Sequence, residues 1–183
     1  MNFRKVIEII IKNFQEYEIE YAFIGGFAIG ALGIMRSTMD IDLLVNKRDL
    51  NTIDTILTSH LYRRRYRSEN VSQYVSDLKP LGNIDLLHAF RSRALSMLKR
   101  ARKIPIFNSQ YEIHVLIPED IIGLKVQAMI NDPERKTLEC ADIELLMEHF
   151  HTTMDWQLLE EYFELFNVKD YFGVLKTKYG KTQ

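Results

Sequence analysis

Hydrophobic residues in the first part of the chain follow helical spacing at some positions and strand spacing at others. Phe3, Val6 and Ile10 open a stripe at intervals of three and four residues, which predicts a helix from Asn2 to about Glu16. A short apolar run then predicts a buried strand over residues 21–24. The same reasoning predicts further helices over 27–33, 49–60 and 92–103, and strands over 40–45, within 62–87, at 104–107 and at 111–115.

The chain changes character at Pro118. Proline followed by Glu119 and Asp120 is typical of a helix start, because proline lacks the amide hydrogen that a first turn leaves unpaired and acids suit the positive end of the helix dipole. Helical spacing then continues over 119–131, 136–150, 155–166 and 168–178. We therefore predict an α/β domain over residues 1–117, followed by a helical portion over residues 118–183.

The composition is that of a globular protein. The 183 residues are 46% hydrophobic and 27% charged, which excludes a disordered chain and a collagen-like fibre. The single cysteine, Cys140, permits no intramolecular disulfide. No apolar run is long enough to span a membrane or to form the core of a signal peptide, so we expect a cytoplasmic protein with no membrane partner.

Charge is unevenly distributed although the net charge is only −1. Residues 61–103 hold 11 Lys and Arg against 3 Asp and Glu, whereas residues 104–183 hold 7 against 14. The basic segment suggests an anionic ligand, or else it neutralises the acidic segment within the fold. Its Arg63–Arg67 run fits an edge strand protected by charge, or, with the interleaved Tyr62, Tyr66 and Tyr74, a nucleic-acid surface.

Three features of the α/β part point to chemistry on phosphate groups. Asp40 and Asp42 are two residues apart on a predicted strand, so their carboxylates project from one face about 6.6 Å apart along the chain. Ionised carboxylates at this spacing repel each other, and a divalent cation such as Mg²⁺ relieves the repulsion. Asp85, on a later predicted strand, would complete a site for two ions, which is an arrangement that performs nucleotidyl transfer.

Gly25 and Gly26 form the third of these features, between the first predicted strand and the next helix. Glycine permits positive φ and a close approach to the backbone, and the amide groups at a helix start attract phosphate oxygens. The spacing differs from a Walker loop, which needs Gly-Lys-Ser/Thr, and from the dinucleotide-binding fingerprint.

The run from Phe23 to Leu43, with its Gly-Gly pair and its Asp-x-Asp pair, resembles the signature of the nucleotidyltransferase superfamily, which has a DNA polymerase β-like fold. The form Arg-x-Thr-x-Asp-x-Asp over residues 36–42 resembles the AbiEii-like family of abortive-infection and toxin–antitoxin nucleotidyltransferases. Residues 118–128 and 135–143 are similar to that family's C-terminal motifs. The resemblance covers residues 21–147 and implies a mixed β-sheet flanked by helices, ahead of the helical portion.

The resemblance also implies a role for each matching residue. Asp40, Asp42 and Asp85 are the expected catalytic carboxylates and metal ligands, for two Mg²⁺ ions or for Mn²⁺, and Asp85 is also a candidate general base. Asp77 stays open as an alternative third carboxylate. The expected nucleotide-binding residues are Gly25, Gly26, Arg36, Thr38, Lys125 and Asp142, with Asp142 pairing with Lys125 or Lys136.

The expected activity is transfer of a nucleoside monophosphate from a nucleoside triphosphate, such as ATP, to an acceptor with release of pyrophosphate. The acceptor would be RNA such as tRNA, or a protein, and the chain would then be a toxin with a cognate antitoxin. One alternative is a small-molecule acceptor of the aminoglycoside or lincosamide type. Another is a non-catalytic module that binds a nucleotide or a partner. The nucleotide used and the formation of a homodimer stay open.

Overall fold

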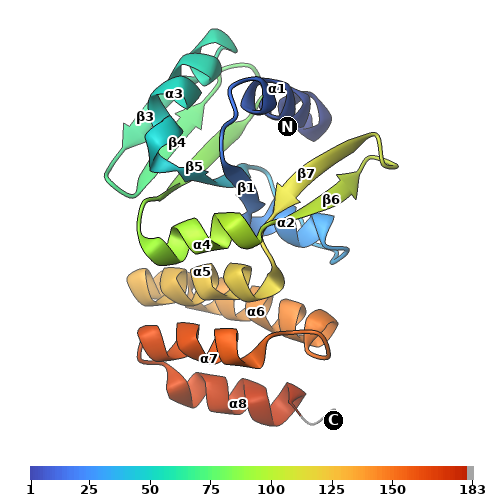
Figure 1. Ribbon diagram of the computed structural model, residues 1–183, viewed down its shortest axis with the longest axis vertical. Helices are drawn as coiled ribbons and strands as arrows, with labels where there is room; N and C mark the ends of the chain where they lie inside the picture. The colour runs from blue at the N-terminus through green and yellow to red at the C-terminus, as the bar shows by residue number, and fades with distance from the viewer. Residues whose placement is uncertain (181–183) are drawn as a thin grey trace. The chain divides into compact units, whose positions relative to one another are not determined.

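The computed structural model describes residues 1–180 and divides the chain into two compact units, with the boundary between Leu116 and Ile117. The first unit is built on a mixed sheet of seven strands in the order β3-β4-β5-β2-β1-β7-β6 (Figure 1). Within it, β2 pairs with β5 and β1 with β7 in parallel, and the other pairs are antiparallel. The strands are β1 (Tyr21–Ile24), β2 (Ile41–Asn46), β3 (Arg63–Arg67), β4 (Val71–Val75), β5 (Asn83–Ala89), β6 (Arg102–Ile106) and β7 (Tyr111–Val115).

One face of this sheet is a hydrophobic core. Ile41, Leu43 and Val45 project from it and are fully buried, as alternation along a strand requires. Helix α1 packs on this face through Phe14, whose ring meets that of Tyr21 edge to face. The helices of the first unit are α1 (Phe3–Glu16), α2 (Gly25–Ala31), α3 (Leu50–Ser59) and α4 (Ser92–Arg100), with a 3₁₀ turn at Lys47–Asp49 before α3.

The second unit is helical. It comprises α5 (Pro118–Asn131), a 3₁₀ turn (Pro133–Arg135), α6 (Lys136–Phe150), α7 (Trp156–Leu165) and α8 (Lys169–Tyr179). Helix α5 contacts both α6 and α7. A close approach at Gly123 makes the α5–α7 contact possible, because a Cβ there would lie 2.8 Å from the Tyr162 ring. Tyr162 and Phe163 of α7 and Phe172 of α8 are buried and belong to the core of this unit.

The architecture confirms the predicted fold class, a mixed sheet with helices followed by C-terminal helices. Several boundaries differ from the prediction. Strand β2 begins at Ile41, so Asp40, which was predicted to lie on this strand, comes just before it. Helix α2 begins at Gly25 rather than at residue 27, and α4 ends at Arg100 because β6 starts at Arg102. Among the described residues, no helix is long and apolar enough to cross a membrane.

Candidate active site

Two of the predicted carboxylates lie on neighbouring strands. The parallel strands β2 and β5 pair Asp42 with Asp85. Paired residues of adjacent strands project from the same face, so these two side chains lie next to each other on the face opposite Ile41 and Leu43. On the other side of Asp42, β1 pairs Ile24 with it, and the chain enters α2 at the next residue, Gly25. Three separate segments therefore meet at Asp42.

Gly25 allows the Asp42 carboxylate to lie directly against the backbone of α2. Its φ is +65°, in the left-handed region, and a Cβ at this position would lie 2.0 Å from Asp42 Oδ2 and 2.7 Å from Asp42 Cγ. No residue with a side chain fits there without moving the carboxylate. The two glycines are the first two residues of a helix of only seven residues, so their clearest contribution is this close approach.

Gly26 brings the loop before β2 against the same helix. A Cβ at Gly26 would lie 2.9 Å from the Cβ of Thr38. The Thr38 hydroxyl donates a 3.1 Å hydrogen bond to the backbone carbonyl of Asp40, and Arg36 donates a 2.5 Å hydrogen bond to the carbonyl of Ser37. Thr38 therefore orders the loop that carries Asp40, next to α2.

Asp40 lies just before β2 and is half-buried. Its Oδ1 accepts a 3.0 Å hydrogen bond from Nδ2 of Asn83, the first residue of β5. Asp77, the alternative third carboxylate, lies beyond the end of β4 and forms a 3.8 Å ion pair with Arg63. The structure thus places Asp85, rather than Asp77, beside Asp42.

A metal ion at this place would have carboxylate ligands, the oxygen donors that Mg²⁺ prefers. The paired carboxylates of Asp42 and Asp85 fit this chemistry. Asp40 would become a third ligand by giving up its hydrogen bond from Asn83 and binding the ion instead. In residues 1–180 as described, no three His, Cys, Asp or Glu side chains already lie close enough together to hold a metal.

The second unit holds the other two predicted nucleotide-binding residues in a buried ion cluster. Lys125 Nζ donates hydrogen bonds of 2.6 Å to Asp142 and 2.9 Å to Glu139, and the Lys125 residue is only 8% exposed. Arg135 lies 2.5 Å from the other oxygen of Glu139. Asp142 thus pairs with Lys125, one of the two partners expected for it. Glu139 was not predicted from the sequence, although acids three residues apart on a helix share one face.

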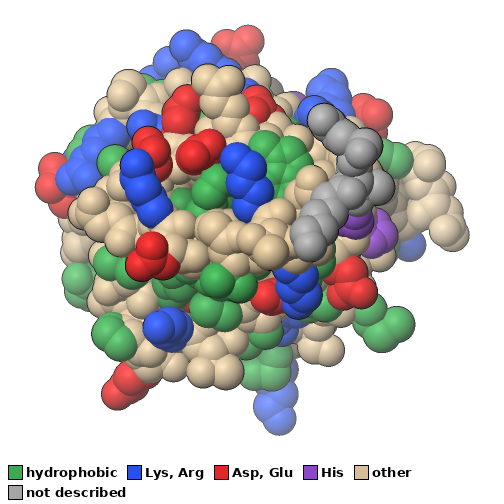
Figure 2. Space-filling model, turned by 90° about the horizontal axis from the view of Figure 1, so that it is seen from below, with side chains coloured by type: hydrophobic (Ala, Val, Ile, Leu, Met, Phe, Trp, Pro, Cys, Tyr) green, Lys and Arg blue, Asp and Glu red, His purple; other side chains and the backbone are tan. Residues whose placement is uncertain are grey.

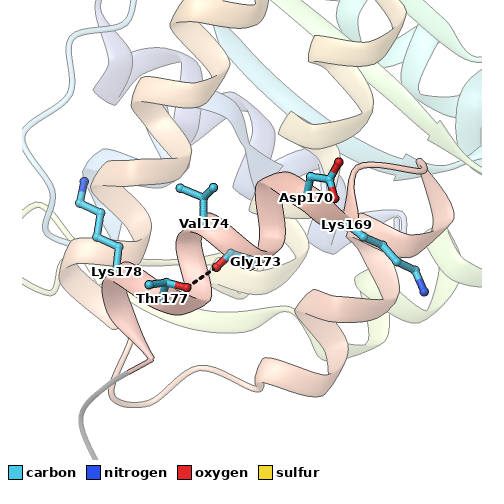
Figure 3. A pocket seen from close by; sticks show the side chains of 6 residues that line it. All are labelled: Lys169, Asp170, Gly173, Val174, Thr177 and Lys178. Carbon is cyan, nitrogen blue, oxygen red and sulfur yellow. Dashed lines mark hydrogen bonds between the residues drawn. The ribbon is translucent and has the colours of Figure 1, made fainter.

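Helix α8 lines an open hollow of about 670 Å³ (Figure 3). The two lysines that line the hollow have acidic partners, Glu164 for Lys169 and Glu144 for Lys178, and Thr177 donates a 2.8 Å hydrogen bond to the carbonyl of Gly173. Figure 2 shows basic, acidic and hydrophobic side chains intermixed on the surface seen from below. None of the predicted site residues lines the hollow, so we assign it no role in the chemistry.

Residues 2–174 match the family described as uncharacterised nucleotidyltransferases. The chain belongs to this nucleotidyltransferase family. The match confirms the superfamily expected from the Gly-Gly and Asp-x-Asp motifs, and it does not show the AbiEii-like family. No curated protein sequence matches the chain.

Solved structures agree with the nucleotidyltransferase fold. The solution structure of the antibiotic-resistance factor ANT(2'')-Ia matches with a TM-score of 0.66 and 16% identity, over 100% of each chain. A crystal structure of ANT(2'')-Ia with adenylyl-2''-tobramycin matches with a TM-score of 0.67 and 15% identity, over 90% of this chain and 97% of that one. The lincomycin-bound lincosamide adenylyltransferase LnuA gives 0.53 and 13%, over 78% and 94%. An antigenic nucleotidyltransferase-like protein from Paracoccidioides brasiliensis gives 0.56 and 17%, over 96% and 92%.

Proposed function

We propose that this nucleotidyltransferase transfers a nucleoside monophosphate from a nucleoside triphosphate to a hydroxyl group of a small-molecule acceptor. The pairing of Asp42 with Asp85, directly beside Gly25, carries the proposal. Two neighbouring carboxylates on one face of a sheet suit a site for a metal ion, and the metal ion in turn would bind the reacting phosphate. A stabilising role alone would not explain why a glycine with positive φ is needed beside one of them.

In the proposed reaction, the acceptor oxygen attacks the α-phosphorus of the nucleotide. A bond forms between that oxygen and the phosphorus, and the bond from the phosphorus to the pyrophosphate oxygen breaks. Asp85 accepts the proton of the acceptor hydroxyl, and pyrophosphate leaves with the electron pair of the broken bond. When bound to Asp40, Asp42 and Asp85, Mg²⁺ would neutralise phosphate charge and lower the pKa of the acceptor hydroxyl.

The nucleotide phosphates would lie on the α2 side of Asp42. Gly25 and Gly26 allow Asp42 and Thr38 to approach the backbone of α2 there, and Arg36 and Thr38 belong to the loop packed against the same helix. Lys125 and Asp142 are harder to assign to this role. A phosphate contact by Lys125 would require it to leave Asp142, so we propose that these two residues chiefly stabilise the second unit.

The choice of a small-molecule acceptor rests on two observations. ANT(2'')-Ia and LnuA, which share the fold, are described as an antibiotic-resistance factor and a lincosamide antibiotic adenylyltransferase. In addition, Tyr62 and Tyr74 are 2% and 1% exposed, so two of the three tyrosines expected on a nucleic-acid surface cannot stack on bases. An RNA or protein acceptor, a toxin role with an antitoxin, the AbiEii-like assignment, a homodimer and a cytoplasmic location stay predictions.

The test offers each of the four nucleoside triphosphates, labelled at the α-phosphate, together with Mg²⁺ or Mn²⁺. The acceptors are a low-molecular-weight cell extract, total RNA and total protein in separate reactions. We expect label to enter the small-molecule fraction with the wild-type protein and with Asp77→Asn, and not with Asp42→Asn or Asp85→Asn. Asp77→Asn is the matched control, because it removes another carboxylate of the same unit.

Three results would contradict parts of this proposal. Label in RNA or protein would identify a macromolecular acceptor. Loss of transfer in Asp77→Asn with activity kept in Asp85→Asn would make Asp77 the third carboxylate. Absence of label from every fraction, from a protein that is folded, would favour the non-catalytic module.

A further inference from the structure

The row of paired residues that contains Asp42 and Asp85 continues across two more strands. Asp85 pairs with Gln73 on β4, and Gln73 pairs with Tyr66 on the edge strand β3. Because paired residues share a face, these four side chains form one row across the sheet. Tyr66 is 51% exposed and Gln73 is half-buried, whereas Tyr74, on the opposite face of β4, is almost fully buried.

A β-bulge puts Tyr66 in this row. The register of β3 and β4 shifts between Arg64, which pairs with Tyr74, and Tyr66, which pairs with Gln73. In a regular ladder without the bulge, Arg65 would pair with Gln73 and Tyr66 with Ser72, which is fully buried on the other face. A bulge can re-aim a side chain next to an active site. Here it turns an exposed aromatic ring toward the face that bears the carboxylates.

If the proposed function holds, the nucleotide binds at the Asp42 end of this row of four side chains and the acceptor binds at the Tyr66 end. Phosphates lie by Gly25 and Asp42, and Asp85 takes the acceptor proton, so the rest of the acceptor extends beyond Asp85. We propose that Gln73 and Tyr66 form the acceptor subsite, with a ring of the acceptor stacked on Tyr66. Strands are about 4.8 Å apart, which places Tyr66 about 10 Å from Asp85 across the sheet. The acceptor therefore spans about that length, the size of one or two rings.

The charge around Tyr66 indicates what the acceptor carries. Strand β3 has four arginines and is exposed along its whole length. Arg63 pairs with Val75 and so shares the face of Tyr66. Arg64 and Arg67 pair with Tyr74 and Ser72 and therefore belong to the opposite face. Asp77 lies 3.8 Å from Arg63 and offsets only part of its charge, and the exposed Arg65 adds a second cation next to Tyr66 in the strand. The subsite therefore suits a small acceptor with a ring and a negative group, such as a phosphate or carboxylate, over a polyamine of the aminoglycoside kind.

A binding experiment tests the subsite without requiring activity. Saturation-transfer NMR would follow phenyl phosphate, a ring with a negative group, and benzylamine, a ring with a positive group, each mixed with the full-length protein. We expect phenyl phosphate to bind the wild type, to bind Tyr66→Ala at least fivefold more weakly, and to bind Tyr17→Ala as the wild type does. Tyr17, 55% exposed in the same unit, is the matched control. Equal binding to Tyr66→Ala, or stronger binding of benzylamine, would overturn the proposal.

A kinetic experiment tests the same subsite in turnover. The low-molecular-weight extract is separated into anionic, neutral and cationic pools, and each pool is offered with the labelled nucleotide. We expect transfer with the anionic pool, and a rise in the KM for that pool of fivefold or more in Tyr66→Ala, with the KM for nucleotide unchanged. Transfer confined to the cationic pool, or an unchanged acceptor KM, would refute the subsite. Absence of transfer with every pool would contradict the proposed function. The NMR experiment would then still show whether the surface at Tyr66 binds a ring with a negative group.

Discussion

Replacing Gly25 by alanine should disturb the site more than the same change at Gly26 or Gly30. The new Cβ would lie 2.0 Å from Asp42 Oδ2, so the carboxylate must leave its position. The residue would also have to keep a φ of +65°, a conformation that disfavours residues with a side chain. Gly30→Ala is the matched control, since Gly30 lies in the same helix and a Cβ there meets no atom within 4 Å.

The expected size of the effect follows from these two contributions. A left-handed backbone costs a residue other than glycine roughly 1–2 kcal/mol. For a chain of this length that corresponds to a fall in Tm of roughly 2–8 °C, and displacement of Asp42 adds to it. Because moving a reacting group by about 1 Å can reduce a rate on the order of 100-fold, nucleotidyl transfer should fall by a similar factor. Gly30→Ala should stabilise the protein by up to about 1 kcal/mol, because alanine is the better helix former.

The measurement is chemical unfolding of Gly25→Ala, of Asp42→Ala and of the double variant, with nucleotidyl transfer followed for Gly25→Ala. In the Asp42→Ala background the carboxylate is gone, so the cost of Gly25→Ala should shrink to the backbone contribution and a remaining 3.0 Å contact with the Cβ of residue 42. A Gly25→Ala protein as stable and as active as the wild type would refute this expectation. An equal cost in both backgrounds would also refute it, because the contact with Asp42 would then contribute nothing.

Three further predictions concern buried polar groups. Burial lowers the pKa of the His88 imidazole, so folding favours its neutral form. The resulting contribution to the unfolding free energy should be fully present above the unfolded pKa of about 6.5 and should be lost as the pH falls through the lowered folded pKa. Denaturant titrations between pH 7 and pH 5 should show this decrease, reduced in His88→Gln. Lys125→Met should lower the unfolding free energy by about 3–5 kcal/mol, since it removes the buried cation that Asp142 and Glu139 share and leaves Glu139 with Arg135 alone. A raised nucleotide KM with unchanged stability would instead favour a phosphate contact. Tyr162→Phe removes the 2.5 Å hydrogen bond to buried Asp120 and should lower the unfolding free energy by about 1.5–3 kcal/mol, measured by thermal unfolding. An unchanged Tm would show that this bond does not stabilise the fold.

Much of the fold follows from the sequence because burial is periodic. The stripe from Phe3 onward predicted α1, and Val6, Ile7 and Ile10 are indeed fully buried. Pro118 is the first residue of α5, as its chemistry predicts. In such elements the spacing of the apolar side chains predicts both the type of element and the face that is buried.

The start of α2 was not predictable in this way. Gly25 and Gly26 have no side chain to contribute to a hydrophobic pattern, and the contact that requires Gly25 comes from Asp42, 17 positions further along the chain. Gly25 has the positive φ and the close approach that were expected at this strand-to-helix junction; only the start of the helix differs, since α2 begins at Gly25 rather than at residue 27.

Contacts between segments far apart in the sequence also determine the position of Tyr66 and the burial of Lys125. The all-exposed strand β3 has no apolar alternation, so the pattern could not place the bulge at Arg65 that turns Tyr66 over. Likewise, Lys125 resembles an exposed helix lysine in sequence. Its burial depends on Glu139 and Asp142, which a neighbouring helix brings to it.

Transfer of label from an α-phosphate-labelled nucleotide in the presence of Mg²⁺, compared between the wild type and Asp42→Asn, decides whether the paired carboxylates perform the chemistry. Unfolding curves of the two proteins are measured alongside. We predict transfer by the wild type and none by Asp42→Asn, with Asp42→Asn at least as stable because repulsion with Asp85 is relieved. Transfer that persists in a folded Asp42→Asn protein would contradict the proposed site.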